Sequence, residues 1–124
     1  MQVYNTRGFA RFARRERIKD GKLCEAVARA ERGLIDADLG GGVIKQRLPR
    51  QGQGRSGGYR VIVFYRTSSR TVFVDGFAKS DQDNIDDEDV ARLKDLAREF
   101  LGHSGKSVQA LVEAGAWIEV ECDD

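Results

Sequence analysis

The sequence has few of the residues that build the commonest catalytic and metal sites. Its 124 residues include one histidine, His103, and two cysteines, Cys24 and Cys122, which lie far apart along the chain. A zinc site needs clustered Cys and His ligands, and a serine-type triad would depend on His103 alone. We therefore expect no metal site, no cofactor and no triad chemistry.

The cysteines are also too few for a disulfide framework, and long hydrophobic runs are missing. We expect Cys24, in a predicted helix, and Cys122, near the C-terminus, to be reduced thiols. No apolar run approaches the roughly 18 residues of a membrane span. The N-terminal stretch MQVYNTRGFARFARRERIK has arginines where a signal peptide has its apolar core. These features predict a cytoplasmic protein that does not bind a membrane.

Charge is plentiful but unevenly distributed. The chain is 40% hydrophobic and 33% charged, which predicts a single globular domain over residues 1–124. Residues 1–79 contain 17 Lys and Arg against 7 Asp and Glu, whereas residues 80–124 contain 4 against 13. This split indicates a face that binds a polyanion. The alternative is that both signs mix over the folded surface.

Hydrophobic periodicity predicts an α+β fold with two helices near the N-terminus. A short strand at residues 3–4 precedes a helix that Thr6 would cap, and Asp20 would cap a second helix that Gly33 ends. Their apolar stripes are Phe9, Phe12 and Ala13, and Leu23, Val27, Ala30 and Leu34. Asp86 or Asp87 would cap a third helix. Residues 102–124 would form a C-terminal extension, with a helix over 107–114 and a strand over 117–120.

The strongest strand signals are residues 59–66 and 71–79, separated by the four-residue turn 67–70. If an antiparallel hairpin closes on this turn, Arg66 pairs with Thr71 and the rest of the register follows. One face would then be apolar and suited to cover by helices, and it would consist of Tyr59, Val61, Val63, Tyr65, Val72, Val74, Gly76 and Ala78. The opposite face would carry Arg60, Ile62, Phe64, Arg66, Thr71, Phe73, Asp75, Phe77 and Lys79.

That opposite face would gather cations at one end of the sheet. Lys45 and Arg47, on a preceding strand over 40–48, would join Arg60 and Lys79 around the ring of Phe77. Cations neutralise phosphates and bases stack on aromatic rings, so this face suits a single RNA strand. Alternatively, the phenylalanines of this face would fill a second small core.

A glycine-rich segment lies beside these cations. Residues 49–58 contain the only proline of the chain and four of its glycines, which predicts a loop. Glycine lets backbone N–H groups approach an anion closely, although Gly57 and Gly58 would equally suit an awkward turn into the next strand. The pattern GxxxxGK[ST] is absent, which argues against a nucleoside triphosphatase.

The order of these elements and two motifs resemble a known family. Ser56-Gly57-Gly58-Tyr59-Arg60 opens the central strand, and Phe77-Ala78-Lys79-Ser80 closes the next one. Over roughly residues 3–101 the chain is similar to RelE/HigB-like toxins of bacterial type II toxin–antitoxin systems. The resemblance implies a RelE-like fold, with a small, mainly antiparallel sheet, two N-terminal helices on one face and a helix after the central hairpin.

The same resemblance implies a function and site residues. Family members are typically metal-independent endoribonucleases that cut ribosome-bound mRNA, inhibit translation and are neutralised by a cognate antitoxin. The implied catalytic residues are Arg60, Lys79 and Tyr59, with the RNA 2′-OH as the nucleophile. The implied RNA-binding residues are Lys45, Arg47, Arg50, Arg55 and Phe77. The general base stays open among Lys79, Tyr59, Tyr65 and Asp75.

The chain departs from the family after the position of Lys79, in having no histidine in the site, since His103 lies beyond the third helix, and in residues 102–124, which extend past the usual short toxin. RelE-type toxins carry a further arginine and a tyrosine soon after the position of Lys79, but here residues 80–85 read SDQDNI. Two other functions therefore stay open: a ParE-like inhibitor of DNA gyrase, and a noncatalytic module that binds RNA or an antitoxin.

Overall fold

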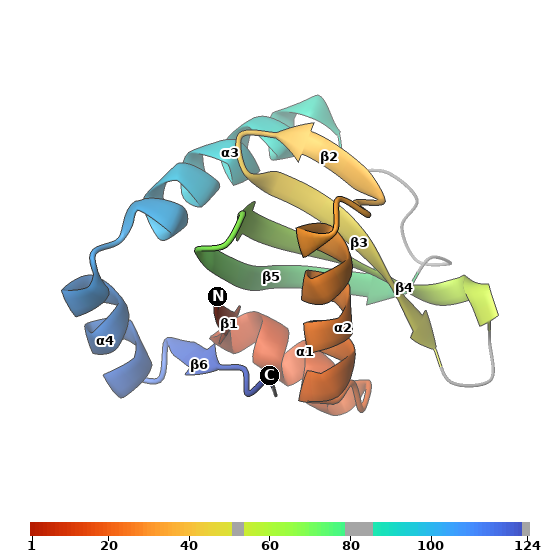
Figure 1. Ribbon diagram of the computed structural model, residues 1–124, viewed down its shortest axis with the longest axis horizontal. Helices are drawn as coiled ribbons and strands as arrows, with labels where there is room; N and C mark the ends of the chain where they lie inside the picture. Colours follow the sequence, from red (N-terminus) through yellow and green to blue (C-terminus); the bar gives the residue numbers. More distant parts are fainter. Residues whose placement is uncertain (51–53, 79–85, 123–124) are drawn as a thin grey trace.

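The computed structural model describes residues 1–50, 54–78 and 86–122, and Figure 1 shows their arrangement. The elements in chain order are β1 (Gln2–Thr6), α1 (Arg7–Arg15), α2 (Asp20–Glu31), β2 (Ala37–Gly40), β3 (Val43–Arg50), β4 (Gly54–Arg66), β5 (Arg70–Ala78), α3 (Asp87–Gly102), α4 (Gly105–Glu113) and β6 (Trp117–Glu119). The six strands form one sheet in the order β2-β3-β4-β5-β1-β6. β1 lies parallel to β5, and the other neighbouring pairs are antiparallel. This is the predicted α+β class.

Local sequence signals fix most helix ends. The side chains of Thr6 and Asp86 accept hydrogen bonds from the first turns of α1 and α3, which confirms both predicted caps. The predicted cap at Asp20 is wrong by one residue, because Lys19 is the N-cap of α2 and Asp20 is its first helical residue. Leu34 is 55% exposed and lies outside the core, because the helix has already ended at Glu31.

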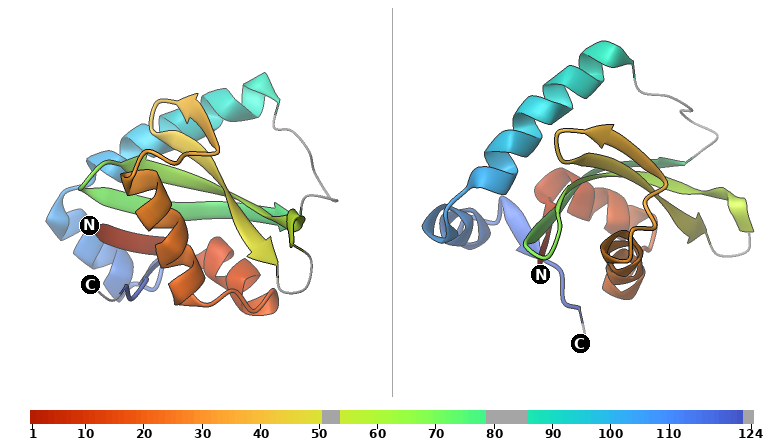
Figure 2. Two further views of the ribbon diagram at one scale, coloured as in Figure 1. Left: turned by 45° about the vertical axis from the view of Figure 1, so that its right-hand side comes forward. Right: turned by 45° about the horizontal axis from the view of Figure 1, so that its top comes forward.

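Helices cover both faces of the sheet, as the two views of Figure 2 show. α1 and α2 bury one face around Phe9, Leu23 and Val61, whereas α3 covers the centre of the other face. Ile62 and Phe64 of β4 are fully buried against α3. The prediction that this second face stays open is therefore wrong for its central part. The run of apolar residues from 61 to 65 already has the composition of a strand buried on both sides.

The predicted hairpin register is correct in one half of the hairpin only. Tyr59 lies opposite Ala78, and the pairs follow the prediction as far as Ile62 and Asp75. Beyond Ile62 the register shifts by one residue, so that Arg66 lies opposite Arg70 and the turn has three residues in place of four. The extra residue of β5 forms a β-bulge.

Because of the bulge, Phe73 and Val72 each pack on the face of the sheet opposite to the one predicted. Phe73 packs in the α1 and α2 core, where its ring lies 5.3 Å from that of Phe9, and Val72 packs in the α3 core. Both positions are the reverse of the prediction, because a shift of one residue moves a side chain to the other face of a strand. Val74 also packs towards α3.

The segment predicted as a loop is largely strand. β3 continues to Arg50 and β4 begins at Gly54, so the two strands form a hairpin whose residues 51–53 lie outside the described residues. A Cβ atom on Gly58 would lie 2.2 Å from the carbonyl oxygen of Leu48. Glycine is thus required at position 58 by the close approach of β3 and β4.

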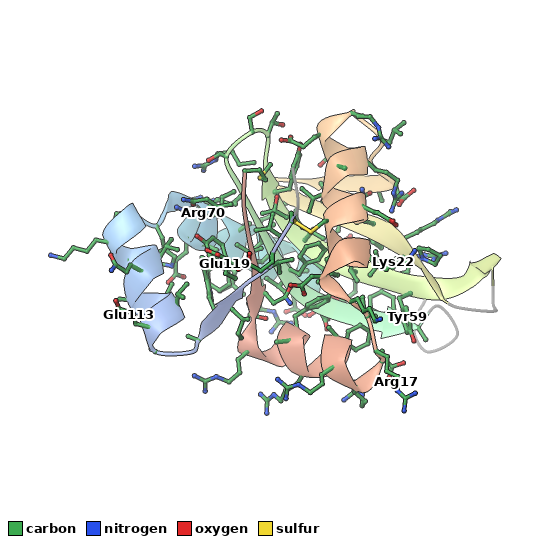
Figure 3. The ribbon with its side chains drawn as sticks, turned by 60° about the horizontal axis from the view of Figure 1, so that its bottom comes forward. Arg17, Lys22, Tyr59, Arg70, Glu113 and Glu119 are labelled. Atoms are coloured by element: carbon green, nitrogen blue, oxygen red, sulfur yellow. A yellow bond between two sulfur atoms is a disulfide. The ribbon has the colours of Figure 1, made fainter. Side chains whose placement is uncertain are left out.

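The C-terminal extension completes the sheet and ends in a disulfide. β6 pairs with β1, and the buried Val120 donates its N–H to the carbonyl of Val3. This path brings Cys122 beside α2, where it forms a disulfide with Cys24 at a Cα–Cα distance of 5.7 Å (Figure 3). The prediction of two reduced thiols is wrong, because this pairing depends on tertiary structure that joins residues 98 positions apart.

Candidate nucleic-acid interface

Strand register brings three of the predicted cations onto one face of the sheet. Arg47 lies opposite Arg60, which lies opposite Phe77, so these residues form one row across β3, β4 and β5. In the neighbouring row Lys45 lies opposite Ile62. Directly opposite residues share a face, so Lys45, Arg47 and Arg60 lie together on the α3 side of the sheet. We call these three residues the cationic sheet face.

The cations of this face have no carboxylate partner among the described residues. Arg47 is exposed and Lys45 and Arg60 are partly exposed, and none of the three forms an ion pair there. Arg60 donates a long hydrogen bond of 3.5 Å to the carbonyl oxygen of Tyr59. Their charge is therefore available to an anionic ligand.

An ion pair holds the backbone of Arg47 and leaves its guanidinium group exposed. Arg29 and Asp36 form this ion pair at 3.3 Å. The Asp36 carboxylate accepts the backbone N–H of Arg47 at 2.7 Å, while Arg29 donates to the Arg47 carbonyl. Sequence reasoning missed both residues, because it did not predict the short strand β2 that follows Asp36.

Phe77 does not present an exposed ring. It is 8% exposed and belongs to the α3 core. The predicted exposure of this side chain is wrong, because α3 folds over the sheet next to it. Of the two alternatives given for the phenylalanines, a second core is correct for Phe64 and Phe77, whereas Phe73 packs in the core with α1 and α2.

Tyr59 lies on the opposite face from Arg60. Its ring packs edge-on against Phe12 at 5.7 Å, and its hydroxyl donates to Glu16 at 2.8 Å. Consecutive residues of a strand point to opposite faces, so the structure does not bring Tyr59 together with the cationic sheet face. Tyr59 instead lines an open cleft of about 840 Å³ beside the turn between α1 and α2.

Comparison with known protein families identifies the family of this chain. Residues 1–120 match the family model described as RelE toxin of the RelE / RelB toxin-antitoxin system. The chain belongs to the RelE toxin family. RelE toxins generally cleave mRNA and act in a pair with an antitoxin, so the family makes this protein the toxin of such a pair. No curated protein matches its sequence.

Three of the residues expected from the RelE resemblance are not placed by the structure. Lys79 lies outside the described residues. The backbones of Arg50 and Arg55 belong to β3 and β4, but their side chains lie outside the described part of the chain. Their roles stay predictions.

Two of the candidate general bases are placed apart from each other. Tyr65 is buried in the core with α1 and α2, and its hydroxyl donates to Glu31. Burial raises the pKa of Tyr65, and the hydrogen bond to Glu31 raises it further. Asp75 lies opposite Ile62 in the row of Lys45, and its carboxylate is exposed. Of the candidate bases that the structure describes, Asp75 is the one that shares a face with Arg60.

No group of three or more His, Cys, Asp or Glu residues suited to a metal ion occurs within residues 1–50, 54–78 and 86–122. Over the same ranges, no helix is long and apolar enough to cross a membrane. His103 packs against the rings of Phe100 and Trp117, at 6.1 and 5.6 Å, away from the cationic sheet face.

Proposed function

We propose that this RelE toxin is a metal-independent endoribonuclease that cleaves ribosome-bound mRNA and so inhibits translation. The observation that supports this proposal most directly is the convergence of Lys45, Arg47 and Arg60 on one face of the sheet without carboxylate partners among the described residues. Single-stranded RNA binds to such a face through its phosphates. The partners under this proposal are mRNA on the ribosome and a cognate antitoxin.

The proposed reaction uses the RNA itself as the nucleophile. The 2′-oxygen attacks the adjacent phosphorus, the bond from phosphorus to the 5′-oxygen breaks, and a 2′,3′-cyclic phosphate and a 5′-hydroxyl result. Arg60 would stabilise the negative charge that develops on the phosphate oxygens. Lys45 and Arg47 would bind neighbouring phosphates and align the 2′-oxygen with the scissile bond.

Protons must leave the 2′-hydroxyl and reach the 5′-oxygen. We propose Asp75 as the base that accepts the first proton, because its exposed carboxylate lies in the row next to Arg60. A positioned base typically contributes about 10²–10⁴-fold to a rate. Lys79, which the RelE motif supplies, is proposed as the group that assists Arg60 and protonates the 5′-oxygen. Tyr59 is not included, because its hydroxyl points to the other face.

Cleavage of mRNA on purified ribosomes tests the proposal. Arg60→Ala should lower the cleavage rate by about 10²–10³-fold, as expected for loss of one preorganised cation. Arg98→Ala is a suitable control, because Arg98 is 82% exposed on α3 and carries the same charge. Both variants should keep the circular dichroism spectrum and melting temperature of the wild type. Equal rates for Arg60→Ala and wild type would contradict the proposed mechanism.

Expression in bacteria separates the two other functions. Arrest of translation that requires Arg60 supports the endoribonuclease. A DNA-damage response with loss of gyrase supercoiling would indicate a ParE-like inhibitor, and the absence of any growth effect would indicate a noncatalytic module.

A further inference from the structure

One ion pair binds the backbone of a residue on the cationic sheet face. Arg29 of α2 and Asp36, which directly precedes β2, pair at 3.3 Å. The Asp36 carboxylate accepts the backbone N–H of Arg47 at 2.7 Å, and the second terminal nitrogen of Arg29 donates to the Arg47 carbonyl. The Arg29–Asp36 pair therefore binds both polar groups of the Arg47 backbone.

This pair takes the place of a neighbouring strand. β3 lies between β4 and the edge strand β2 (Figure 1). The register of β2 and β3 runs from Gly40 opposite Val43 to Ala37 opposite Lys45, so β2 ends before it reaches Arg47. A strand at this position would supply a backbone carbonyl and a backbone N–H. At Arg47 a carboxylate and a guanidinium group supply the acceptor and the donor.

A buried amide fixes the backbone at Asp36. The side-chain oxygen of Gln46 accepts the Asp36 N–H at 2.8 Å. The side-chain nitrogen of Gln46 donates to the carbonyls of Ala26, in α2, and Leu34, at 3.1 and 3.2 Å. Gln46 is buried, and a buried polar group with these partners holds one arrangement of its neighbours. The Asp36 carboxylate is thus held in position relative to both α2 and β3.

The folded state does not need the Arg29–Asp36 pair to satisfy the backbone of Arg47. Arg47 is exposed, and the pair lines an open cleft of about 530 Å³ together with Arg47. Water that enters this cleft would hydrogen-bond to the Arg47 N–H and carbonyl nearly as well as a side chain does. Water does not fix the path of a strand, whereas the pair connects Arg47 to α2 and to the start of β2. The specific contribution of the pair is therefore the position of Arg47.

The pair also keeps the Arg47 guanidinium group available to an anion. The Asp36 carboxylate lies close to the backbone of Arg47, yet Arg47 forms no ion pair with any residue that the structure describes. Arg29 balances the charge of Asp36 instead. The side chains of Arg29 and Asp36 are 30% and 28% exposed, so their ion pair is partly shielded from water.

We infer that Asp36, held by Arg29, is a positioning residue for RNA binding, because it fixes the backbone of Arg47 in the row that contains Arg60. Arg47 lies directly opposite Arg60. Two cations that contact neighbouring phosphates of one strand need a fixed relative position, since small displacements cost both binding and alignment. The inference rests on the proposed function, in which Arg47 binds a phosphate beside the scissile one. An acidic residue would then strengthen the binding of an anion, which is the opposite of what its charge alone predicts.

Affinity for single-stranded RNA tests the inference without a cleavage step. The probe is a short RNA whose 2′-oxygens are methylated, so that it lacks the nucleophile. Asp36→Ala should bind this RNA about tenfold more weakly than the wild type, as expected for partial loss of one charged hydrogen bond. The control is Asp38→Ala, which removes the same charge two residues away, where the carboxylate accepts the N–H of Gly40. Asp38→Ala should bind RNA at least as tightly as the wild type, and equal affinities of the two variants would overturn the inference.

A double-mutant cycle separates positioning from charge. In an Arg47→Ala background, Asp36→Ala should no longer weaken RNA binding, because the residue that Asp36 positions has lost its guanidinium group. Asp36→Asn keeps a side-chain oxygen for the Arg47 N–H and should retain most of the affinity. Equal losses in the two backgrounds, or equal losses for Asp36→Asn and Asp36→Ala, would overturn the inference. So would wild-type affinity of Arg47→Ala.

Arg29→Ala is a second variant for the case that Asp36→Ala does not fold, which circular dichroism and thermal unfolding establish. Arg29→Ala should weaken RNA binding in the wild type and not in the Arg47→Ala background. Loss of charge alone would weaken binding in both backgrounds and would overturn the inference. Failure of the proposed function is seen separately, as mRNA cleavage on ribosomes that does not require Arg60.

Discussion

Removal of the disulfide should lower stability by an amount that the length of the closed loop sets. The change is Cys122→Ser, chosen because Cys122 is exposed and its sulfur contributes little to the core. Cys24 and Cys122 lie 98 positions apart, so the disulfide restricts most of the unfolded chain. In the chain-entropy model a loop of about 100 residues contributes about 4.7 kcal/mol, and loss of a native disulfide typically costs about 2–5 kcal/mol.

This loss converts into a change in melting temperature. At about 2.1 cal/mol/K per residue, a 124-residue chain has an unfolding entropy of roughly 260 cal/mol/K. A loss of about 2–5 kcal/mol then lowers the melting temperature by about 8–19 °C. The native state of the variant should be otherwise unchanged, because Trp117 and Val120 anchor the C-terminal segment through buried side chains.

Thermal unfolding followed by circular dichroism, with and without a reductant, provides the measurement. The reduced wild-type protein should have the same melting temperature as the variant, and the reductant should not change the melting temperature of the variant. Titration of thiols in the native, oxidised protein should find none. Two titratable thiols, or a melting temperature unchanged within about 2 °C in Cys122→Ser, would refute the reasoning.

Three further predictions concern backbone approach, a buried cation and pH. Gly58→Ala should lower the free energy of unfolding by about 1–3 kcal/mol, because the new Cβ atom would lie 2.2 Å from the Leu48 carbonyl oxygen. Gly8→Ala is the control, because a Cβ atom at Gly8 would have no atom within 4 Å. Equal stabilities of the two variants would contradict the explanation. Arg70→Ala should lower the free energy of unfolding, measured with denaturant, by about 2–3 kcal/mol, since the buried Arg70 guanidinium donates to three carbonyl oxygens at the end of α3. A decrease of less than about 0.5 kcal/mol would count against this role. The pKa of Tyr65 is raised above its unfolded value of 10.0, so the stability that the neutral phenol contributes is fully present below pH 10 and is lost as the pH rises from 10 towards the raised pKa. The free energy of unfolding of Tyr65→Phe should therefore fall less steeply above pH 10 than that of the wild type. An identical slope for the two proteins would argue against the raised pKa.

Features set by a few neighbouring residues were predictable from the sequence. Thr6 and Asp86 cap their helices through contacts three residues away, and the alternation of Ile44 and Lys45 along β3 assigns their faces. The same alternation placed Arg60 correctly with the cations of β3. Strand periodicity and hairpin pairing alone are sufficient to predict that Lys45, Arg47 and Arg60 lie on one face of the sheet.

Features set by distant parts of the chain were not predictable. The bulge in β5 leaves no local signal, because the choice between two registers depends on which side chains fill the two cores. Burial of Phe77 depends on the path of α3, and the disulfide depends on the docking of β6. In each case the deciding contact joins segments that are far apart in the sequence, and hydrophobic periodicity gives no information about such contacts.

The position of β1 in the sheet has a consequence for synthesis of the toxin. β1 lies between β5 and β6, where Gln2 pairs with Arg70 and Tyr4 pairs with Glu119. β1 therefore has no neighbour in the sheet until residues 70–78 have been made, and its second neighbour is added only when residues 117–119 have been made. Such non-local pairing delays folding. The sheet is therefore completed only after β6 has emerged, long after β1, its neighbour in the sheet.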